Sequence, residues 1–149
     1  MRRGTYHIAV GIWTVNDRNE ILITLRSPEK HDWPDLWENT AGSLLAGETS
    51  RQGAVRELFE ETGIRAAEDE LFFLGTETGR STIGDCYIVR KNVDIRDIVF
   101  QKGETCCARW VTLPDLDEMI EGDLVAPPVA ARLVKVRGRF EDYLYGRIG

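Results

Sequence analysis

A segment of 13 residues, 50–62, carries the strongest helix signal in the chain and constrains its fold more than any other feature. Thr49 and Gln52, three residues apart, form a capping-box pattern, and Gly63 supplies the left-handed residue that often ends a helix. At ~100° per residue, the apolar side chains of the segment share one face. These side chains are Ala54, Val55, Leu58 and Phe59. We therefore expect an amphipathic helix that buries this face in the core.

The opposite face of the same helix carries three carboxylates. Glu57 stands three and four residues before Glu60 and Glu61, so the three side chains are neighbours on the helix surface. Like charges at this spacing destabilise a helix by roughly 0.2–0.5 kcal/mol per pair, which favours a compensating cation. A divalent metal that takes oxygen ligands, Mg²⁺ above all, meets this need. Such a triplet alone is more often a solvated glutamate face than a metal site.

Strand patterns flank the helix on both sides. Runs of β-branched and aromatic residues at 6–15 and 20–25, separated by turn residues, predict a β-hairpin. The two prolines of 27–36 predict a loop, after which 37–41 can return as a short strand. Beyond the helix, we expect further strands at 71–74, 85–90 and 108–112.

Two more helices are predicted in the last third of the chain. Pro114 suits a first helical turn and Gly122 suits a helix end. Apolar residues at helical spacing between Val129 and Tyr145 indicate a final amphipathic helix. Because helices and strands are mixed and do not alternate strictly, the expected class is α/β, a sandwich with a mixed β-sheet.

Length and charge limit the classes of partner. A chain of 149 residues can bury one core and is too short to favour two domains, so a single domain over 1–149 is expected. Its net charge of −6 leaves no broad basic surface for a nucleic-acid polymer. The three cysteines favour no disulfide framework, and no apolar run approaches the ~20 residues of a membrane span. We expect a cytoplasmic protein whose partner is a small phosphorylated molecule and neither a membrane nor a nucleic acid.

The spacing of residues around the acidic helix matches the Nudix signature G-x5-E-x7-R-E-U-x-E-E-x-G-U, in which U is a bulky aliphatic residue. The matching residues are Gly42, Glu48, Arg56, Glu57, Leu58, Glu60, Glu61, Gly63 and Ile64. With each of the seven fixed letters expected at roughly one in 15, chance agreement is on the order of 10⁻⁸ per starting position. The chain thus resembles the Nudix hydrolase family. The resemblance implies an α/β/α sandwich that hydrolyses a nucleoside diphosphate linked to another group.

The resemblance also assigns roles to particular residues. The metal ligands would be the side chains of Glu57, Glu60 and Glu61 and the carbonyl oxygen of Gly42, with Mg²⁺, or Mn²⁺ in its place, as the cofactor. Glu48 and Arg56 would be supporting catalytic residues whose ion pair orients the acids. Glu57 and Glu104 are both candidates for the general base that removes a proton from the attacking water. Homodimers are common in the family, and the oligomeric state stays open.

Residues 7–48 also resemble the isopentenyl-diphosphate isomerase branch of the same superfamily. This second resemblance implies that Arg26 and Lys30 contact a diphosphate. The catalytic cysteine of the isomerases, however, corresponds to Ala41, which can neither donate nor accept a proton. We therefore expect hydrolysis. Isomerisation and a noncatalytic nucleotide-binding module are the alternatives, and the group on either side of the pyrophosphate stays open.

Overall fold

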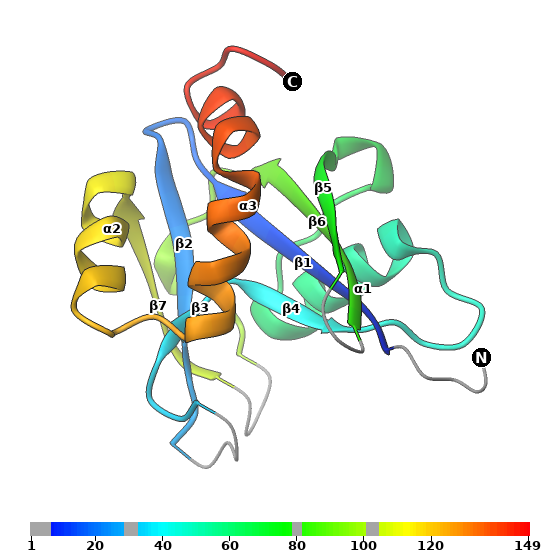
Figure 1. Cartoon of the computed structure of the whole chain (residues 1–149), viewed down its shortest axis with the longest axis horizontal. Helices are drawn as coiled ribbons and strands as arrows, with labels where there is room; N and C mark the ends of the chain where they lie inside the picture. The colour runs from blue at the N-terminus through cyan, green and yellow to red at the C-terminus, as the bar shows by residue number, and fades with distance from the viewer. Residues whose placement is uncertain (1–6, 29–32, 79–81, 101–104) are drawn as a thin grey trace.

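The computed structural model describes residues 7–28, 33–78, 82–100 and 105–149, and within these ranges seven strands form one sheet (Figure 1). Its order is β3-β2-β1-β6-β5, while β4 pairs with β1 and β7 with β2. The β1–β6 pair is parallel and the other described pairs are antiparallel, so the sheet is mixed, as predicted. The strands are β1 (His7–Val15), β2 (Glu20–Arg26), β3 (Trp37–Glu38), β4 (Thr40–Ser43), β5 (Phe72–Thr78), β6 (Thr82–Arg90) and β7 (Thr105–Thr112).

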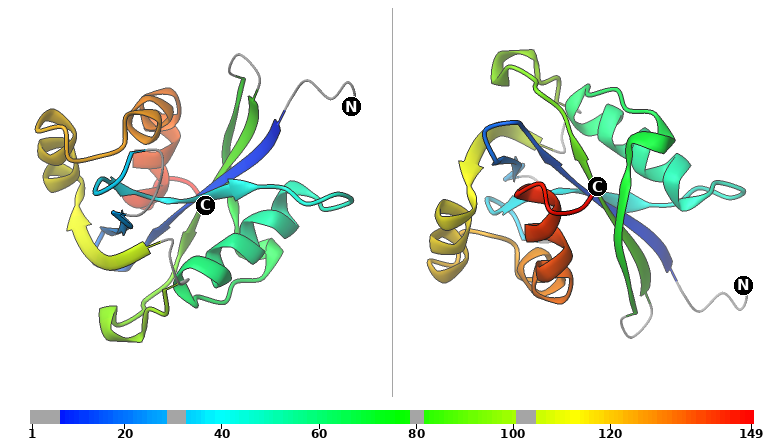
Figure 2. Two further views of the ribbon diagram at one scale, coloured as in Figure 1. Left: turned by 90° about the horizontal axis from the view of Figure 1, so that it is seen from below. Right: turned by 90° about the horizontal axis from the view of Figure 1, so that it is seen from above.

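Helices cover both faces of the sheet (Figure 2). The α-helices are α1 (Ser50–Thr62), α2 (Leu113–Glu121) and α3 (Pro127–Leu144). The side chains of β1 contribute to two hydrophobic clusters, one on each face of the sheet, because successive strand residues point to opposite faces. Val10 and Ile12 pack on the face that α1 covers, whereas Trp13 and Val15 pack on the face that α2 and α3 cover. The predicted α/β/α sandwich is confirmed.

The ends of α1 lie where the sequence predicts them. The Thr49 hydroxyl accepts a hydrogen bond from the Gln52 N–H at 3.1 Å, and the Gln52 side chain accepts one from the Thr49 N–H at 2.9 Å. Gly63 ends the helix with a φ of 79°, a left-handed conformation that favours glycine. The prediction that Phe59 belongs to the buried apolar face was wrong. Phe59 is exposed, and the Cζ atom of Arg65 lies 4.4 Å from the centroid of its ring.

The predicted hairpin exists only at its closed end. Val15 pairs with Ile21, and the two strands then diverge to different partners. Along most of its length β1 pairs with β4 and β6, whereas β2 pairs with β3 and β7. The single strand predicted at 37–41 is likewise two strands, β3 on β2 and β4 on β1. Asn39 forms the break, and its buried side chain donates to the Ile12 carbonyl at 3.4 Å.

The other predicted elements are present with different limits. The strands predicted at 71–74, 85–90 and 108–112 correspond to β5, β6 and β7, each of which extends into polar residues because pairing continues where apolar alternation stops. The capping predictions for α2 are confirmed, with Pro114 in its first turn and Gly122 at its end. Helix α3 begins two residues earlier than predicted, at Pro127. None of the helices in the described ranges is long and apolar enough to cross a membrane.

The packing of α3 on the sheet allows a prediction about the free energy of unfolding. Phe140 is 0% exposed, and its ring meets Trp13 edge-on at a centroid distance of 5.3 Å. We expect Phe140→Ala to lower the free energy of unfolding by about 3–5 kcal/mol, because it leaves a cavity at this contact. Val134→Ala, on the same helix but 74% exposed, should change it by less than about 0.5 kcal/mol. Urea denaturation of both variants checks this, and equal losses would contradict the packing described.

Candidate active site

Arg56 on α1 is the centre of the polar contacts made by the signature residues. Its Nε and Nη2 donate to the two carboxylate oxygens of Glu48 at 2.7 and 3.0 Å, a bidentate pair. Nη2 also donates to the carbonyl of Ser43 at 3.0 Å, which ties α1 to β4. Nη1 donates to Glu60 at 3.1 Å and lies 3.6 Å from a carboxylate oxygen of Glu57. One guanidinium therefore holds three carboxylates and a strand in fixed relative positions.

This arrangement keeps Glu48 ionised. Its hydrogen bonds from Arg56, and then from the Leu45 N–H, lower the pKa of Glu48 from its ordinary 4.5 to about 2. The same pairing with Glu48 raises the pKa of Arg56. Both partners therefore stay charged at neutral pH.

Glu57 occupies the space that a side chain at Gly42 would fill. A Cβ at Gly42 would lie 1.8 Å from Oε2 of Glu57 and 2.3 Å from its carboxylate carbon. The glycine is therefore required for close approach of the carboxylate to the backbone of β4. Carboxylate oxygens are hard donors of the kind that Mg²⁺ takes. These residues fit a divalent cation, although the described side chains form no preassembled group of three metal-binding residues.

The other two acids differ in exposure. Glu60 is 41% exposed at the surface of α1, and Arg56 is its partner. Glu61 is only 7% exposed, although it was expected on the polar face. The reason is geometric, because at 100° per residue Glu61 lies about 20° from Ala54 around the helix, on the border of the buried face. Substitution of Glu61 would therefore disturb the core as well as the site.

The direction of the main-chain carbonyls in β4 bears on the predicted Gly42 ligand. The Leu44 N–H donates to the Ile8 carbonyl at 2.9 Å, which places Val10 and Gly42, two residues along, in a hydrogen-bonded pair. The Gly42 carbonyl therefore points toward β1. The carbonyls of Ala41 and Ser43 point to the opposite edge of β4, where Arg56 binds the latter.

Arg26 lies in a different environment from the one predicted. Its Nη1 donates to Glu38 at 2.8 Å, and its Nε donates to the Trp33 carbonyl at 3.1 Å. Both side chains of the Arg26–Glu38 pair are largely buried. The structure thus gives Arg26 an anionic partner within the protein. Lys30, its predicted companion, and Glu104, the second candidate base, lie outside the described residues.

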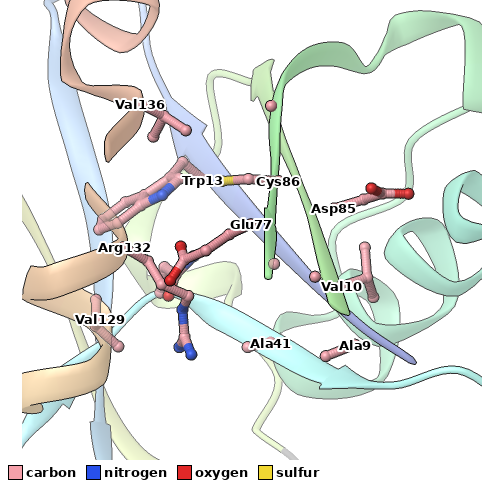
Figure 3. A pocket seen from close by; sticks show the side chains of 14 residues that line it. Ala9, Val10, Trp13, Ala41, Glu77, Asp85, Cys86, Val129, Arg132 and Val136 are labelled. Atoms are coloured by element: carbon pink, nitrogen blue, oxygen red, sulfur yellow. The ribbon is translucent and has the colours of Figure 1, made fainter. Parts of the chain in front are cut away.

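A cavity of about 200 Å³ lies between the sheet and α3 (Figure 3). Its lining from the sheet includes Ala41, the neighbour of Gly42 in β4. Because adjacent strand residues point to opposite faces, Ala41 faces the cavity while Gly42 faces Glu57. The acids and the cavity are thus separated by the thickness of one short strand.

Sequence reasoning missed the functional potential of this cavity. Trp13 is a core residue that also forms part of the cavity wall. Glu77 on β5 and Arg132 on α3 carry charges into the same space (Figure 3). The available signal was the recurrence of Ala or Gly at every second position, as at Ala9 and Gly11, which denies a strand its usual side chains.

A comparison with known protein families agrees with this geometry. The NUDIX domain model matches residues 5–133. The chain belongs to the Nudix family. An uncharacterized Nudix hydrolase of Listeria monocytogenes is 34% identical over 120 residues, 78% of this chain and 69% of the relative. Like its Nudix relatives, the chain is a hydrolase that acts on pyrophosphate bonds.

Two further comparisons are informative in different ways. The NUDIX domain of Shewanella oneidensis NrtR, solved with ADP ribose, matches with a TM-score of 0.70 at 19% identity, over 90% of this chain and 88% of that one. At this identity the likeness concerns the fold alone. The isopentenyl-diphosphate isomerase of Pectobacterium atrosepticum is 38% identical over 73 residues, 48% of this chain and 41% of the isomerase. This Nudix chain has Ala41 at the isomerase cysteine position, so we retain hydrolysis as its activity.

The Glu48–Arg56 pair predicts a pH-dependent contribution to stability. Because folding lowers the pKa of Glu48, the contribution is fully present above pH 4.5 and is lost as the pH falls toward about 2. We expect Glu48→Gln to lower the Tm at neutral pH, and the difference from wild type to vanish across that window. Thermal melts over the pH range measure this. Glu121→Gln, an exposed carboxylate on α2, controls for loss of one charge, and a pH-independent Glu48 effect would contradict the pairing.

Proposed function

We propose that the chain catalyses Mg²⁺-dependent hydrolysis of a pyrophosphate bond in a nucleoside diphosphate linked to another group. One observation carries this proposal: Gly42 admits the Glu57 carboxylate on one face of β4, while Ala41 opens into a cavity on the other. A substrate that crosses β4 would place its phosphates at the acids and one substituent in the cavity. The cytoplasm is the proposed location. The complex of the NrtR domain with ADP ribose supports a small nucleotide substrate.

The proposed metal ligands are Glu57, Glu60 and Glu61 together with a main-chain carbonyl of β4. We assign that carbonyl to Ala41 and no longer to Gly42, because the Gly42 carbonyl points toward β1. When bound, the metal neutralises phosphate oxygens and lowers the pKa of the attacking water.

The remaining roles follow from the contacts of Arg56. By holding Glu48 and Glu60, it fixes the orientation of the acidic face before substrate binds, so little reorganisation is needed during the reaction. Glu57, which lies against the face of β4 at Gly42, is the first candidate to remove the proton from water, and Glu104 is the second. Arg26 and Lys30 remain the proposed contacts to the phosphates.

The test is a screen of organic pyrophosphates with and without Mg²⁺. The set should contain nucleoside diphosphate sugars, ADP-ribose, nucleoside triphosphates and a prenyl diphosphate. Mass analysis of products formed in H₂¹⁸O would identify the bond broken and the phosphorus attacked. Mg²⁺-dependent release of a nucleoside monophosphate supports the proposal. Binding of these compounds without turnover would favour a noncatalytic nucleotide-binding module, and dimethylallyl diphosphate formed from isopentenyl diphosphate would favour an isomerase.

Glu60 gives the cleanest test of the metal assignment, because its side chain is at the surface. We expect Glu60→Gln to lower kcat by at least ~100-fold with little change in Tm, since an amide is a weaker metal ligand than a carboxylate. Steady-state kinetics and a Mg²⁺ titration of each variant measure this. Glu121→Gln is the matched control for removal of an exposed carboxylate. Unchanged turnover in folded Glu60→Gln would refute the assignment.

Arg26 requires a paired design, because it also binds Glu38. We expect Arg26→Ala to reduce kcat/KM by ~10- to 150-fold for all pyrophosphate substrates alike, through loss of one charge-assisted phosphate contact. The double variant Arg26→Ala/Glu38→Gln also removes the charge of the carboxylate that loses its contact with Arg26. A phosphate contact predicts that the double variant stays impaired. Recovery of activity in the double variant would show that Arg26 serves only as the partner of Glu38.

A further inference from the structure

The cavity between the sheet and α3, called the slot below, is lined by small residues. Five small residues line its sheet side, and Val129 and Val136 of α3 close the opposite side. The five are Ala9, Gly11, Ala41, Gly75 and Gly84. Its volume of about 200 Å³ is below the ~300–1,000 Å³ of pockets that enclose a whole drug-sized ligand. It therefore suits one ring system of a larger substrate, with the rest of the substrate outside.

Trp13 and Cys86 form an uncharged part of the wall of the slot. The indole of Trp13 hydrogen-bonds the thiol of Cys86, and burial raises the pKa of that thiol to about 12. Figure 3 shows the two side chains directed toward each other, while Asp85 points away on the other side of β6. A thiol, an indole and small aliphatic groups favour an aromatic face over an ionic group.

Two charged side chains at the slot have unused hydrogen-bonding capacity. Glu77 is 21% exposed, and within the described ranges its partner is Lys135 at 3.7 Å, too long for a hydrogen bond. Arg132 is exposed, lies one α3 turn from both Val129 and Val136, and makes no hydrogen bond or ion pair to any residue that the structure describes. A ligand in the cavity would thus meet a carboxylate that can accept hydrogen bonds and a guanidinium that can donate them.

We propose that Glu77 and Arg132 read the edge of a guanine base, which makes the substrate a guanosine diphosphate linked to another group. Guanine presents two adjacent donors, N1–H and N2–H, which match the two oxygens of one carboxylate. It presents O6 and N7 as acceptors, a common bidentate target of arginine. Adenine and uracil lack the paired donors, and a prenyl group would leave both charges without partners. This inference rests on the proposed function, whose phosphate chemistry lies on the other face of β4.

Measurement of nucleoside monophosphate binding without metal tests recognition of the base separately from hydrolysis. Calorimetry of the full chain with GMP, AMP and UMP should show GMP binding ~5- to 150-fold more tightly than the other two, the discrimination expected of a bidentate base contact. Glu77→Gln and Arg132→Gln should each reduce this preference by a similar factor. Lys135→Gln, which removes the exposed charge nearest to Glu77, is the matched control and should retain it.

A second variant fills the slot without touching either charge. A Cβ at Gly84 would meet no atom closer than the Ala9 carbonyl oxygen at 3.9 Å, so the first carbon of a Gly84→Val side chain is accommodated and its methyl groups take up space at the cavity wall. We expect it to keep the Tm of wild type and to weaken GMP binding at least ~10-fold, by analogy with loss of a stacked base. Gly138→Ala, where a Cβ meets nothing within 4 Å, is the matched glycine control.

The outcomes separate the two proposals. Equal binding of GMP and AMP, a preference that survives Glu77→Gln, or GMP binding unaffected by Gly84→Val would each overturn the guanine assignment. If the chain hydrolyses adenosine, uridine and guanosine diphosphate derivatives at equal kcat/KM, the guanine assignment fails while the proposed function stands. If GMP binds with the predicted mutational pattern but no Mg²⁺-dependent hydrolysis is found, the proposed function fails and the base reading stands.

Discussion

The guanidinium of Arg56 is the interaction on which the arrangement of the acids depends. It binds Glu48, Glu57 and Glu60, and these three carboxylates together with Glu61 and one guanidinium leave a net charge of −3. That residual charge favours a divalent cation, whereas the same acids without Arg56 would repel one another and separate. The hydrogen bond from Arg56 to the Ser43 carbonyl extends this order to β4. Helix and strand are therefore held together by the same group that orients the acids.

Strand β4 then links the two halves of the proposed site. Adjacent residues point to opposite faces, so Gly42 meets Glu57 while Ala41 opens into the cavity under α3. Both positions need small residues, one to admit a carboxylate and the other to keep the cavity open. A shift of register by one residue would exchange the two faces, and the pairing of β4 with β1 over its whole length fixes that register. Chemistry and recognition can thus be altered independently on one scaffold.

Predictions from local patterns were accurate where the determining contacts are local. The limits of α1, its capping box and the left-handed Gly63 depend on residues within one helical turn, and all were confirmed. The hairpin was wrong beyond Val15 and Ile21, because β1 and β2 each find their main partners elsewhere in the chain. Phe59 and Glu61 were placed on the wrong sides of the burial boundary, since a helical wheel does not state where the sheet lies against the helix.

The sequence by itself determined the family, the order of most elements and the set of acids that surrounds the proposed metal. Each of these depends on residue spacing along the chain, and spacing survives without knowledge of the fold. Only the tertiary structure decided which β4 carbonyl faces outward, that Arg26 is paired with Glu38, and that Glu77 and Arg132 meet at one cavity. Glu77 and Arg132 are 55 positions apart on a strand and a helix, and their proximity follows from the packing of α3 on the sheet. No local pattern encodes such a distance, because it is set by the pairing of β5 with β6 and of β6 with β1, and by the packing of α3 across them.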